Sequence, residues 1–471
     1  MHKNGEEKLS RDTVMTLAIL VVAAMFMILN ETSLAVGLTP IMGDLGVDAT
    51  VVQWLITGFM LTMAVVIPTT GYLLERLSTR HMFFTSVGLF LAGTVVSALA
   101  PVFPLLLAGR VIQAAGTALM VPLLMTVTMT LVPPHRRGAV MGIISVVISV
   151  APALGPTVGG VIIDLSSWHY IFWAMVPPMA LVGIFGAIKL PNAGENRTLP
   201  LDIFSVALSP VAFGGVVYGL ASVEDILAGS VLKLGILGIG VVALAVFIRR
   251  QFALARRERA LLDLRVFKIR NFTFAATSTL LAFGVIIASF TVLPIYLQTS
   301  AGASAKLTGL VVLPGGIVQA VLAPLVGRAY DAYGPRPLVL PGAGMLTGSL
   351  ALLALLTADT PVWAVIGMHC MLSAGMGLLT TPLMTAALSS LPGALYGQGS
   401  AIITTLQQLS AAATTAFLVV FLQRGTASGL AAGQTTADAT ATGISWAFTF
   451  AVGVGLVCWA LAAMVRRVPV D

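Results

Sequence analysis

Residues 15–40 read MTLAILVVAAMFMILNETSLAVGLTP, an apolar run that carries one carboxylate, Glu31, well inside it. A helix needs about 20 apolar residues to cross the hydrocarbon of a bilayer, so this run is long enough to span a membrane. The other carboxylates of the chain lie in the tails, in loops or within a turn or two of the end of an apolar run. Because a charge at bilayer depth costs about 2.5–3.5 kcal/mol, Glu31 is a candidate functional residue.

The composition of the whole chain indicates an integral membrane protein. Hydrophobic residues make up 58% of the 471 positions and charged residues 9%, where soluble domains carry about 25% charged residues. The start, MHKNGEEKLSRD, has no apolar region or cleavage site of a secretory signal, so the first span is expected to stay in the mature protein. Cys370 and Cys458 both lie in apolar runs, which predicts packing and not a disulfide framework.

Apolar runs of spanning length recur along the chain and predict fourteen membrane helices with both ends on one side. They cover about 14–38, 50–74, 81–100, 103–131, 138–163, 168–190, 202–222, 230–250, 272–298, 307–328, 336–357, 361–389, 399–424 and 443–466. The longest loops are expected near 250–271 and 425–442, too short for a soluble domain.

The basic residues fall in alternate loops, which sets the expected orientation. They gather in ERLSTRH (75–81), PHRRG (134–138), KLPNAGENR (189–197), the stretch 249–270 and GRAYDAYGPR (327–336). The positive-inside rule therefore predicts a multi-pass protein of the cell membrane (plasma or inner membrane) with both termini in the cytoplasm. The net charge of +7 is explained by this topology, and no nucleic-acid partner is predicted.

A short internal repeat divides the chain. Glycine, an acid and arginine follow the second and the tenth span with the same offsets of four and nine residues, as Gly71, Glu75, Arg80 and as Gly327, Asp331, Arg336. Two repeated halves with substrate between them are typical of secondary transporters. The expected organisation is a tail at 1–13, a six-helix bundle at 14–190, two inserted helices and a basic linker at 191–271, a second six-helix bundle at 272–466 and a tail at 467–471.

Several stretches resemble one family. GYLLERLSTRH (71–81) is similar to the cytoplasmic signature of the major facilitator superfamily, and LLLAGRVIQAAGTA (105–118) to its fourth-span motif. APALGPTVGG (151–160) is similar to the fifth-span motif of its proton-coupled antiporters. With LNETSLAVGLTP (29–40) and QWLITGFML (53–61), the chain resembles the fourteen-spanner drug:proton antiporter branch. The resemblance implies an all-α polytopic membrane fold of two six-helix bundles plus two inserted helices.

Glu31 and Arg110 are the expected proton-coupling pair. Glu31 lies nine residues before Pro40, about 13 Å below the outer end of its helix, and Arg110 lies six residues after Pro104, about 9 Å below that face. We expect them to interact directly, through Gln113 or through water. The alternatives are a static ion pair or a water-exposed helix end for Glu31, and backbone carbonyls as partners of Arg110. The family often has Asp one position before Glu31, where this chain has Asn30.

The fifth-span motif contributes five small or bending residues, Pro152, Gly155, Pro156, Gly159 and Gly160. Small residues let helices approach closely, and proline bends the helix axis. The resemblance implies that this helix seals the central cavity and favours exchange, whereas simple tight packing is the alternative.

The repeated loops predict a cytoplasmic gate. The expected members are Gly71, Glu75, Arg76, Arg80, Asp331 and Arg336, joined in a charge network that ties two helices together. Ordinary positive-inside loop charge is the alternative interpretation.

Neutral polar side chains of the spans are candidates for substrate contact. They are Asn30, Gln53, Tyr296, Gln298, Gln319, Met384, Thr404, Gln407 and Gln408. Amides, methionine and aromatics suit amphiphilic, weakly charged molecules, although hydrogen bonding between helices is the alternative for each.

Two further features are expected to be ordinary. The basic stretch 249–270 predicts an interfacial helix on anionic lipid, with a regulatory partner site as the alternative. His369 beside Cys370 predicts packing or a polar contact in a cavity. No HExxH, GxSxG or phosphate-binding loop occurs, so neither an enzyme, a metal site nor a cofactor is predicted, and the proton is the only coupling ion.

The sequence therefore predicts a monomeric, proton-driven exporter of amphiphilic small molecules such as drugs or antibiotics, with Glu31 as its protonation site and membrane lipids around it. An exporter of one native metabolite or lipid, an uncoupled facilitator, and a membrane-embedded enzyme or receptor are the alternatives. An uncoupled facilitator would transport normally after Glu31→Gln, and a receptor would bind its ligand without moving it across the membrane.

Overall fold

The computed structural model describes residues 9–191, 202–257, 259–303 and 305–468. Every regular element in these ranges is helical, and fourteen of the helices are long and apolar enough to cross a membrane. An α-helix satisfies its backbone hydrogen bonds within itself, which is what a segment in hydrocarbon requires. The predicted number of spans is confirmed.

The helices fall into two groups of six spans with two more spans inserted between the groups. The first group holds α1 (Arg11–Ser33), η1 (Leu34–Gly37), α2 (Leu38–Leu45), α3 (Ala49–Val52), α4 (Trp54–Arg76), α5 (Thr79–Ala98), α6 (Phe103–Leu131), η2 (Pro134–Arg136), α7 (Arg137–Leu165), α8 (His169–Trp173) and α9 (Val176–Lys189). The insertion holds α10 (Ile203–Ser209), the π-helical turn η3 (Pro210–Gly214), α11 (Gly215–Ala221), α12 (Val223–Leu227), α13 (Val231–Ala255) and η4 (Leu264–Lys268). The second group holds α14 (Arg270–Thr299), α15 (Ala305–Tyr333), α16 (Arg336–Leu353), α17 (Val362–Ser389), η5 (Gly393–Leu395), α18 (Tyr396–Ala431) and α19 (Thr436–Ala463).

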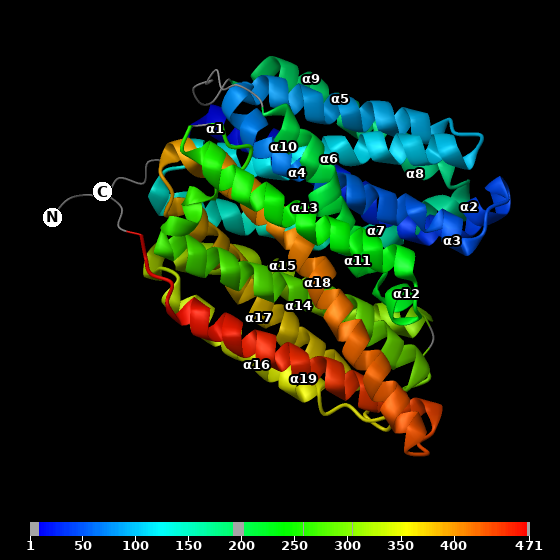
Figure 1. Cartoon of the computed structure of the whole chain (residues 1–471). Coiled ribbons are helices and arrows are strands. Elements are labelled where there is room, and N and C mark those ends of the chain that lie inside the picture. Colours follow the sequence, from blue (N-terminus) through cyan, green and yellow to red (C-terminus); the bar gives the residue numbers. More distant parts are fainter. Residues whose placement is uncertain (1–8, 192–201, 258, 304, 469–471) are drawn as a thin grey trace.

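Each group packs as a bundle, and the two bundles meet along α7 with α15 and along α4 with α18. Figure 1 shows the blue and cyan helices of the first group on one side and the yellow to red helices of the second on the other. The inserted α11 contacts both α4 and α18, so it lies beside the boundary between the bundles. Its aromatic ring at Tyr218 stacks on Trp54 of α4 at 5.8 Å.

One end of the molecule, here called the basic end, holds the junctions α4–α5, α6–α7, α13–α14, α15–α16 and α17–α18. Several contacts between the two bundles lie there. Gly138 of α7 lies against Gly327 of α15, and Gly71 of α4 lies against Gln398 of α18. The two glycines of the sequence repeat, Gly71 and Gly327, thus each pack a helix of one bundle on a helix of the other. Their lack of a Cβ is what allows this approach, because an added Cβ at Gly71 would lie 2.9 Å from Gln398 Oε1.

The largest differences from the predicted boundaries are at three helix ends. The first span does not end near residue 38, because η1 and α2 carry the helical path on to Leu45. Pro40 is tolerated there because it lies in the first turn of α2, where its missing N–H has no helical acceptor. The loop predicted at 425–442 shrinks to four residues between Ala431 and Thr436, since α18 and α19 extend into it.

The basic stretch 249–270 is not an interfacial helix, so that prediction is wrong. Helix α13 ends at Ala255, and the following linker folds back on the bundle with Leu261 and Leu262 buried. The Gln251 side chain accepts a hydrogen bond from the Leu261 N–H at 2.7 Å. Burial of these leucines outweighs the pattern of arginines on which the prediction was based. Residues 192–197 of the predicted loop at 189–197 and parts of both predicted tails lie outside the described residues.

Candidate functional site

Arg110 is the centre of a buried polar cluster in the first bundle. Its side chain is fully buried, and its Nη1 donates to Asn30 Oδ1 at 3.2 Å and to Gln113 Oε1 at 3.0 Å. The guanidinium lies 4.1 Å from the centre of the Phe59 ring, a cation–π contact. Helices α1, α4 and α6 thus all contribute to the binding of one cation.

The cluster continues through Gln113 and ends with two donors that lack acceptors. Gln113 Nε2 donates to Thr94 Oγ1 at 2.7 Å, and Thr94 donates to the Phe90 carbonyl. Among the buried atoms of the described residues, Arg110 Nε and Asn30 Nδ2 have no hydrogen-bond partner. Leaving buried donors unpaired costs about 1–3 kcal/mol each, so the site is suited to take up an acceptor.

Glu31 follows Asn30 but faces a different direction. One helical residue turns the side chain by about 100°, which carries the carboxylate away from the Asn30–Arg110 contact. Glu31 is partly exposed, and none of the close ion pairs among the described residues joins it to Arg110. The two charges still act on each other electrostatically. The direct ion pair that is one form of the predicted interaction is therefore absent here, while the contact of Arg110 with Gln113 is present.

The backbone changes form directly after Glu31. The Thr32 hydroxyl donates to the Ile28 carbonyl at 3.1 Å, and the Ser33 hydroxyl donates to the Leu29 carbonyl at 2.6 Å. Hydroxyls that bond back to the preceding turn weaken the helical ladder and bend the axis. The α-helix gives way to the 3₁₀ turn η1 at Leu34. A 3₁₀ stretch within a helical path often marks a hinge.

The fifth-span glycines pack on this same turn of α1. A Cβ on Gly155 would overlap the Thr32 hydroxyl and lie 2.8 Å from Thr32 Cβ, and a Cβ on Gly159 would lie 2.5 Å from the Ser33 carbonyl oxygen. Gly160 has open space at its Cβ position. Pro152 is partly exposed and Pro156 is exposed. Two of the five motif residues, Gly155 and Gly159, therefore bring α7 against the residues that follow Glu31.

The predicted gate residues are close to the junction of the bundles, but the arginines bind other partners than expected. Arg76 donates to the Tyr72 hydroxyl at 2.6 Å, Arg80 to the Ala187 carbonyl at 2.6 Å, and Arg336 to the Val465 carbonyl at 3.2 Å. None of the close ion pairs among the described residues joins these arginines to Asp331. Three members of the predicted charge network thus bind uncharged groups in this conformation, and the network itself stays a prediction.

Asp331 forms the link across the two bundles. Its two carboxylate oxygens accept the N–H groups of Gly138 and Ala139 at 2.8 Å each, at the first turn of α7. A carboxylate at a helix N-terminus satisfies free N–H groups and the helix dipole. Asp331 on α15 therefore connects the second bundle to α7 of the first through backbone N–H groups. This connection uses no arginine side chain.

Sequence reasoning missed Gln398, which joins three segments at the basic end. It is buried on α18, contacts Gly71 of α4, and accepts a hydrogen bond from the Asp263 N–H of the linker at 3.0 Å. Nothing in the sequence distinguishes Gln398 from the other glutamines of the same helix. Its contacts depend on how α4, α18 and the linker meet.

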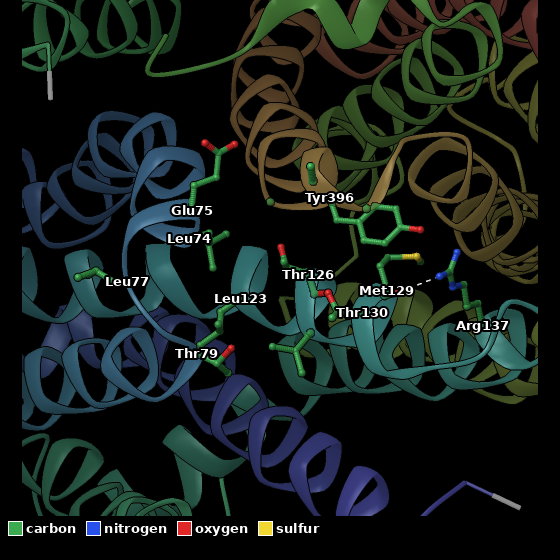
Figure 2. A pocket seen from close by; sticks show the side chains of 14 residues that line it. Leu74, Glu75, Leu77, Thr79, Leu123, Thr126, Met129, Thr130, Arg137 and Tyr396 are labelled. Carbon is green, nitrogen blue, oxygen red and sulfur yellow. Dashed lines mark hydrogen bonds between the residues drawn. The ribbon is translucent and has the colours of Figure 1, made fainter. Parts of the chain in front are cut away.

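A cavity of about 410 Å³ lies at the basic end between the bundles. Figure 2 shows Leu74 and Glu75 on one side of it and Tyr396 with Arg137 on another. The Arg137 guanidinium stacks on the Tyr396 ring at 5.3 Å, and its Nη2 donates to the Met129 carbonyl at 2.8 Å. The basic end is thus closed by contacts between the bundles yet hollow within.

The predicted substrate residues divide by depth. Gln319, Gln407 and Gln408 lie near the middle of α15 and α18 and are partly exposed. Gln53 and Gln298 are exposed at the end opposite the basic end.

The remaining candidates are buried in helix packing. Asn30 binds Arg110, Tyr296 donates to the Thr357 carbonyl at 2.8 Å, and Thr404 donates to the Ser400 carbonyl at 2.8 Å. Met384 packs in the core. In this conformation three of these side chains form hydrogen bonds within the protein, and Met384 is packed among apolar residues. Among the described residues no group of three or more His, Cys, Asp or Glu side chains is placed to hold a metal ion.

The chain is similar to known transporters along its whole length. The model of the family described as Major Facilitator Superfamily matches residues 20–415. The lincomycin resistance protein LmrB of Listeria monocytogenes is 37% identical over 438 residues, which are 91% of this chain and 92% of the relative. LmrB of Bacillus subtilis is 36% identical, with 96% and 95% of the two chains covered. The multidrug resistance protein B homolog of Mycobacterium tuberculosis is 29% identical, with 88% and 77% covered.

Solved structures share the fold at lower identity. The proton:xylose symporter XylE aligns with a TM-score of 0.66 at 16% identity, covering 98% of this chain and 97% of XylE. The human organic anion transporter MFSD10 aligns with a TM-score of 0.63 at 15% identity, covering 96% and 99%. The family match, the curated relatives and the fourteen spans agree, and this chain belongs to the major facilitator superfamily.

Proposed function

We propose that this transporter is a proton-coupled antiporter that exports amphiphilic small molecules of the lincomycin kind, with Glu31 as the protonation site and both termini in the cytoplasm. The orientation is supported by the basic residues of the loops at one end. The substrate class is supported by the names of the LmrB relatives and by the neutral amides of Gln319, Gln407 and Gln408 at mid-depth.

The observation that carries the proposal is that the adjacent residues Asn30 and Glu31 have different surroundings. Asn30 provides the fixed hydrogen bond to Arg110, whereas Glu31 is partly exposed and has no ion pair with it. A carboxylate without a fixed partner can gain or lose a proton without breaking a buried ion pair. Arg110, which is hydrogen-bonded to the neighbouring Asn30, supplies a positive charge close to Glu31.

The transport cycle follows from these groups. An ionised carboxylate only accepts hydrogen bonds, so ionised Glu31 can supply the acceptor that Arg110 Nε and Asn30 Nδ2 lack. Protonation from the outer side removes the charge of Glu31 and with it the electrostatic attraction between Glu31 on α1 and Arg110 on α6, while the hydrogen bond from Arg110 to Asn30 remains. Because Gly155 and Gly159 of α7 pack on the residues after Glu31, a shift of α1 there also moves its contact with α7.

The contacts between the bundles at the basic end support an outward-open conformation for this structure. Asp331 on Gly138 and Gln398 against Gly71 would have to separate before substrate enters from the cytoplasm. Each proton that moves inward yields about 2.3 kcal/mol per 100 mV. At about 1.4 kcal/mol per tenfold, one proton sustains about a fiftyfold gradient of a neutral substrate, so one carboxylate is enough.

The test uses inverted membrane vesicles with an acid-inside pH gradient and labelled lincomycin. Wild type should accumulate lincomycin until nigericin collapses the gradient, and lincomycin should in turn raise the luminal pH. Glu31→Gln should lose proton-driven accumulation of lincomycin. It should still exchange unlabelled lincomycin inside the vesicles for labelled lincomycin outside when no pH gradient is present. Glu224→Gln, which changes an exposed acid far from the cluster, should behave as wild type. Equal accumulation by wild type and Glu31→Gln would indicate a facilitator or a different proton site and would refute the proposal.

A further inference from the structure

His369 occupies in the second bundle the place that Arg110 occupies in the first. Arg110 lies six residues before Gly116 of α6, which packs against α5. His369 lies six residues before Gly375 of α17, which packs against α16. A Cβ on Gly116 would lie 2.7 Å from the Phe90 N, and one on Gly375 would lie 2.6 Å from the Leu346 N.

The helices that receive these glycines correspond in the same way. Phe90 lies ten residues after Arg80 of the sequence repeat, and Leu346 lies ten residues after Arg336. The backbone contacts therefore superpose α6 with α17 and α5 with α16 in the same register, which makes His369 the counterpart of Arg110.

The neighbours of the two residues correspond as well. Phe59, which stacks on Arg110, lies twelve residues before Gly71, and Gly315 lies twelve residues before Gly327. Gly315 contacts His369, since a Cβ there would lie 2.7 Å from the His369 Nε2. Phe59 and Gly315 thus occupy corresponding positions. In the first bundle the Phe59 ring packs on Arg110, and in the second the imidazole of His369 packs directly on Gly315 of α15.

The polar partners of the first site are missing in the second. Gln113, which binds Arg110, lies three residues after it, and the corresponding residue after His369 is the buried Leu372. His369 is 1% exposed, and neither ring nitrogen has a hydrogen-bond partner. The Val312 carbonyl is near enough to influence the ring but does not reach hydrogen-bond geometry. The buried Ser373 hydroxyl also lies beside Gly315, but no hydrogen bond joins it to the imidazole. A buried imidazole without a hydrogen bond costs stability, so packing alone does not account for a histidine at this position.

The helix that covers His369 has a weak point at the same level. Pro314 directly precedes Gly315 within α15 and cannot donate the hydrogen bond that would close the turn, and Gly316 follows. Kinks in long helices occur at such proline and glycine positions. Bending of α15 at residues 314–316 would uncover the imidazole toward the space between the bundles.

We propose that His369 is a substrate-binding residue of the second bundle, which exchanges a hydrogen bond with a hydroxyl or amide of the exported amphiphile when α15 bends. A neutral imidazole offers one donor and one acceptor, which matches these neutral groups. The inference rests on the proposed export function and adds the chemical feature by which substrates are selected. The polar group of the substrate supplies the partner that the ring lacks in the substrate-free protein.

The test compares two probes in inverted vesicles, lincomycin, which carries hydroxyls and an amide, and tetraphenylphosphonium, a cation without hydrogen-bonding groups. His369→Leu should raise the KM for lincomycin by about tenfold, the effect of one lost hydrogen bond, and leave that for tetraphenylphosphonium unchanged. Because neither ring nitrogen of His369 has a hydrogen bond to lose, His369→Leu should fold and melt at or above the wild-type temperature. His369→Gln, which keeps a neutral donor and acceptor, should restore most of the affinity for lincomycin.

The outcomes separate this inference from the export function itself. Transport of both probes by wild type, with an unchanged lincomycin KM in His369→Leu, would overturn the role of His369 and leave the export function standing. Transport of neither probe by wild type would overturn both. An altered pH profile of efflux in His369→Leu without rescue by His369→Gln would assign His369 to proton transfer and would overturn the hydrogen-bonding role.

Discussion

The contact between α7 and the Glu31 turn of α1 can be tested with a single methyl group. In Gly155→Ala the new Cβ would overlap the Thr32 hydroxyl and lie 2.8 Å from Thr32 Cβ and 3.0 Å from the Ser33 N. Rotation of the Thr32 side chain relieves the first overlap, but the other two atoms are fixed by the backbone of α1. The helices therefore have to separate in this conformation.

The expected magnitude follows from the cost of overpacking. One extra carbon in a packed interface costs about 1–3 kcal/mol. If the outward-open conformation alone carries this penalty, the equilibrium constant between it and the other conformations falls by about fivefold to 150-fold at about 1.4 kcal/mol per tenfold, and its population falls by up to this factor. We expect lincomycin efflux to fall by a similar factor, because the carrier spends less time in the conformation that takes up external protons.

Gly160→Ala is the matched control, because it adds the same methyl group to the same helix where the Cβ meets open space. It should transport as wild type. Adding Thr32→Ala to Gly155→Ala removes the hydroxyl and should restore part of the efflux, which a double-mutant cycle measures. Fluorescence-detected size-exclusion chromatography checks that each variant is folded. Wild-type efflux by a folded Gly155→Ala protein would refute the inferred coupling of α7 to this turn.

Three further predictions follow from other contacts. Arg110→Lys keeps the charge but loses the planar group that binds Asn30 and Gln113 and stacks on Phe59, so proton-driven efflux should fall at least about tenfold, and unchanged efflux would show that the cluster is structural. Asp331→Ala removes two hydrogen bonds to α7 and should weaken closure of the basic end by about 1–2 kcal/mol. Closure can be measured by maleimide labelling of Thr126→Cys in a protein without the native cysteines. Labelling should become about fivefold to thirtyfold faster. The hydrogen-bonded Arg250 guanidinium lowers the pKa of Asp202 to about 2, so this pair stabilises the fold above about pH 4 and the contribution is lost as the pH falls toward 2. Since Arg250 is 37% exposed, Asp202→Asn should cost only about 0.5–1 kcal/mol at pH 6, and the difference in melting temperature from wild type should vanish near pH 2.

The number of spans was predictable from the sequence, but some of their ends were not. Hydropathy identifies a span by the length of its apolar run, and this signal is present in all fourteen spans of the described residues, although it is weakest in α16. The extension of α18 to Ala431 depends instead on packing. Gly425 lies against Gly443 of α19, where an added Cβ would be 2.7 Å from the Gly443 Cα. Small and polar residues such as those at 425–431 carry little hydropathy signal even where two helices approach closely.

The depth of the charged residues was also predictable, whereas their partners were not. Counting residues from the helix ends placed Glu31 and Arg110 at a similar level, and the two do act on each other. Which of two adjacent residues faces Arg110 depends on the rotation of α1 about its axis, at about 100° per residue. Packing of Thr32 and Ser33 on the α7 glycines fixes that rotation and turns Asn30 toward Arg110. A single sequence gives no means to fix it.

The two polar niches of the bundles suggest how one fold separates energy coupling from substrate selection. In the first, Arg110 is held by Asn30, Gln113 and Phe59, so its charge is fixed and can bias the neighbouring Glu31. In the second, Leu372 takes the place of Gln113, and His369 has no hydrogen bond. A fixed charge has the same effect on every turnover and suits coupling to a proton, whose identity never varies. An unpaired imidazole gains most from a ligand that brings its own hydroxyl or amide, and it therefore suits the choice among substrates.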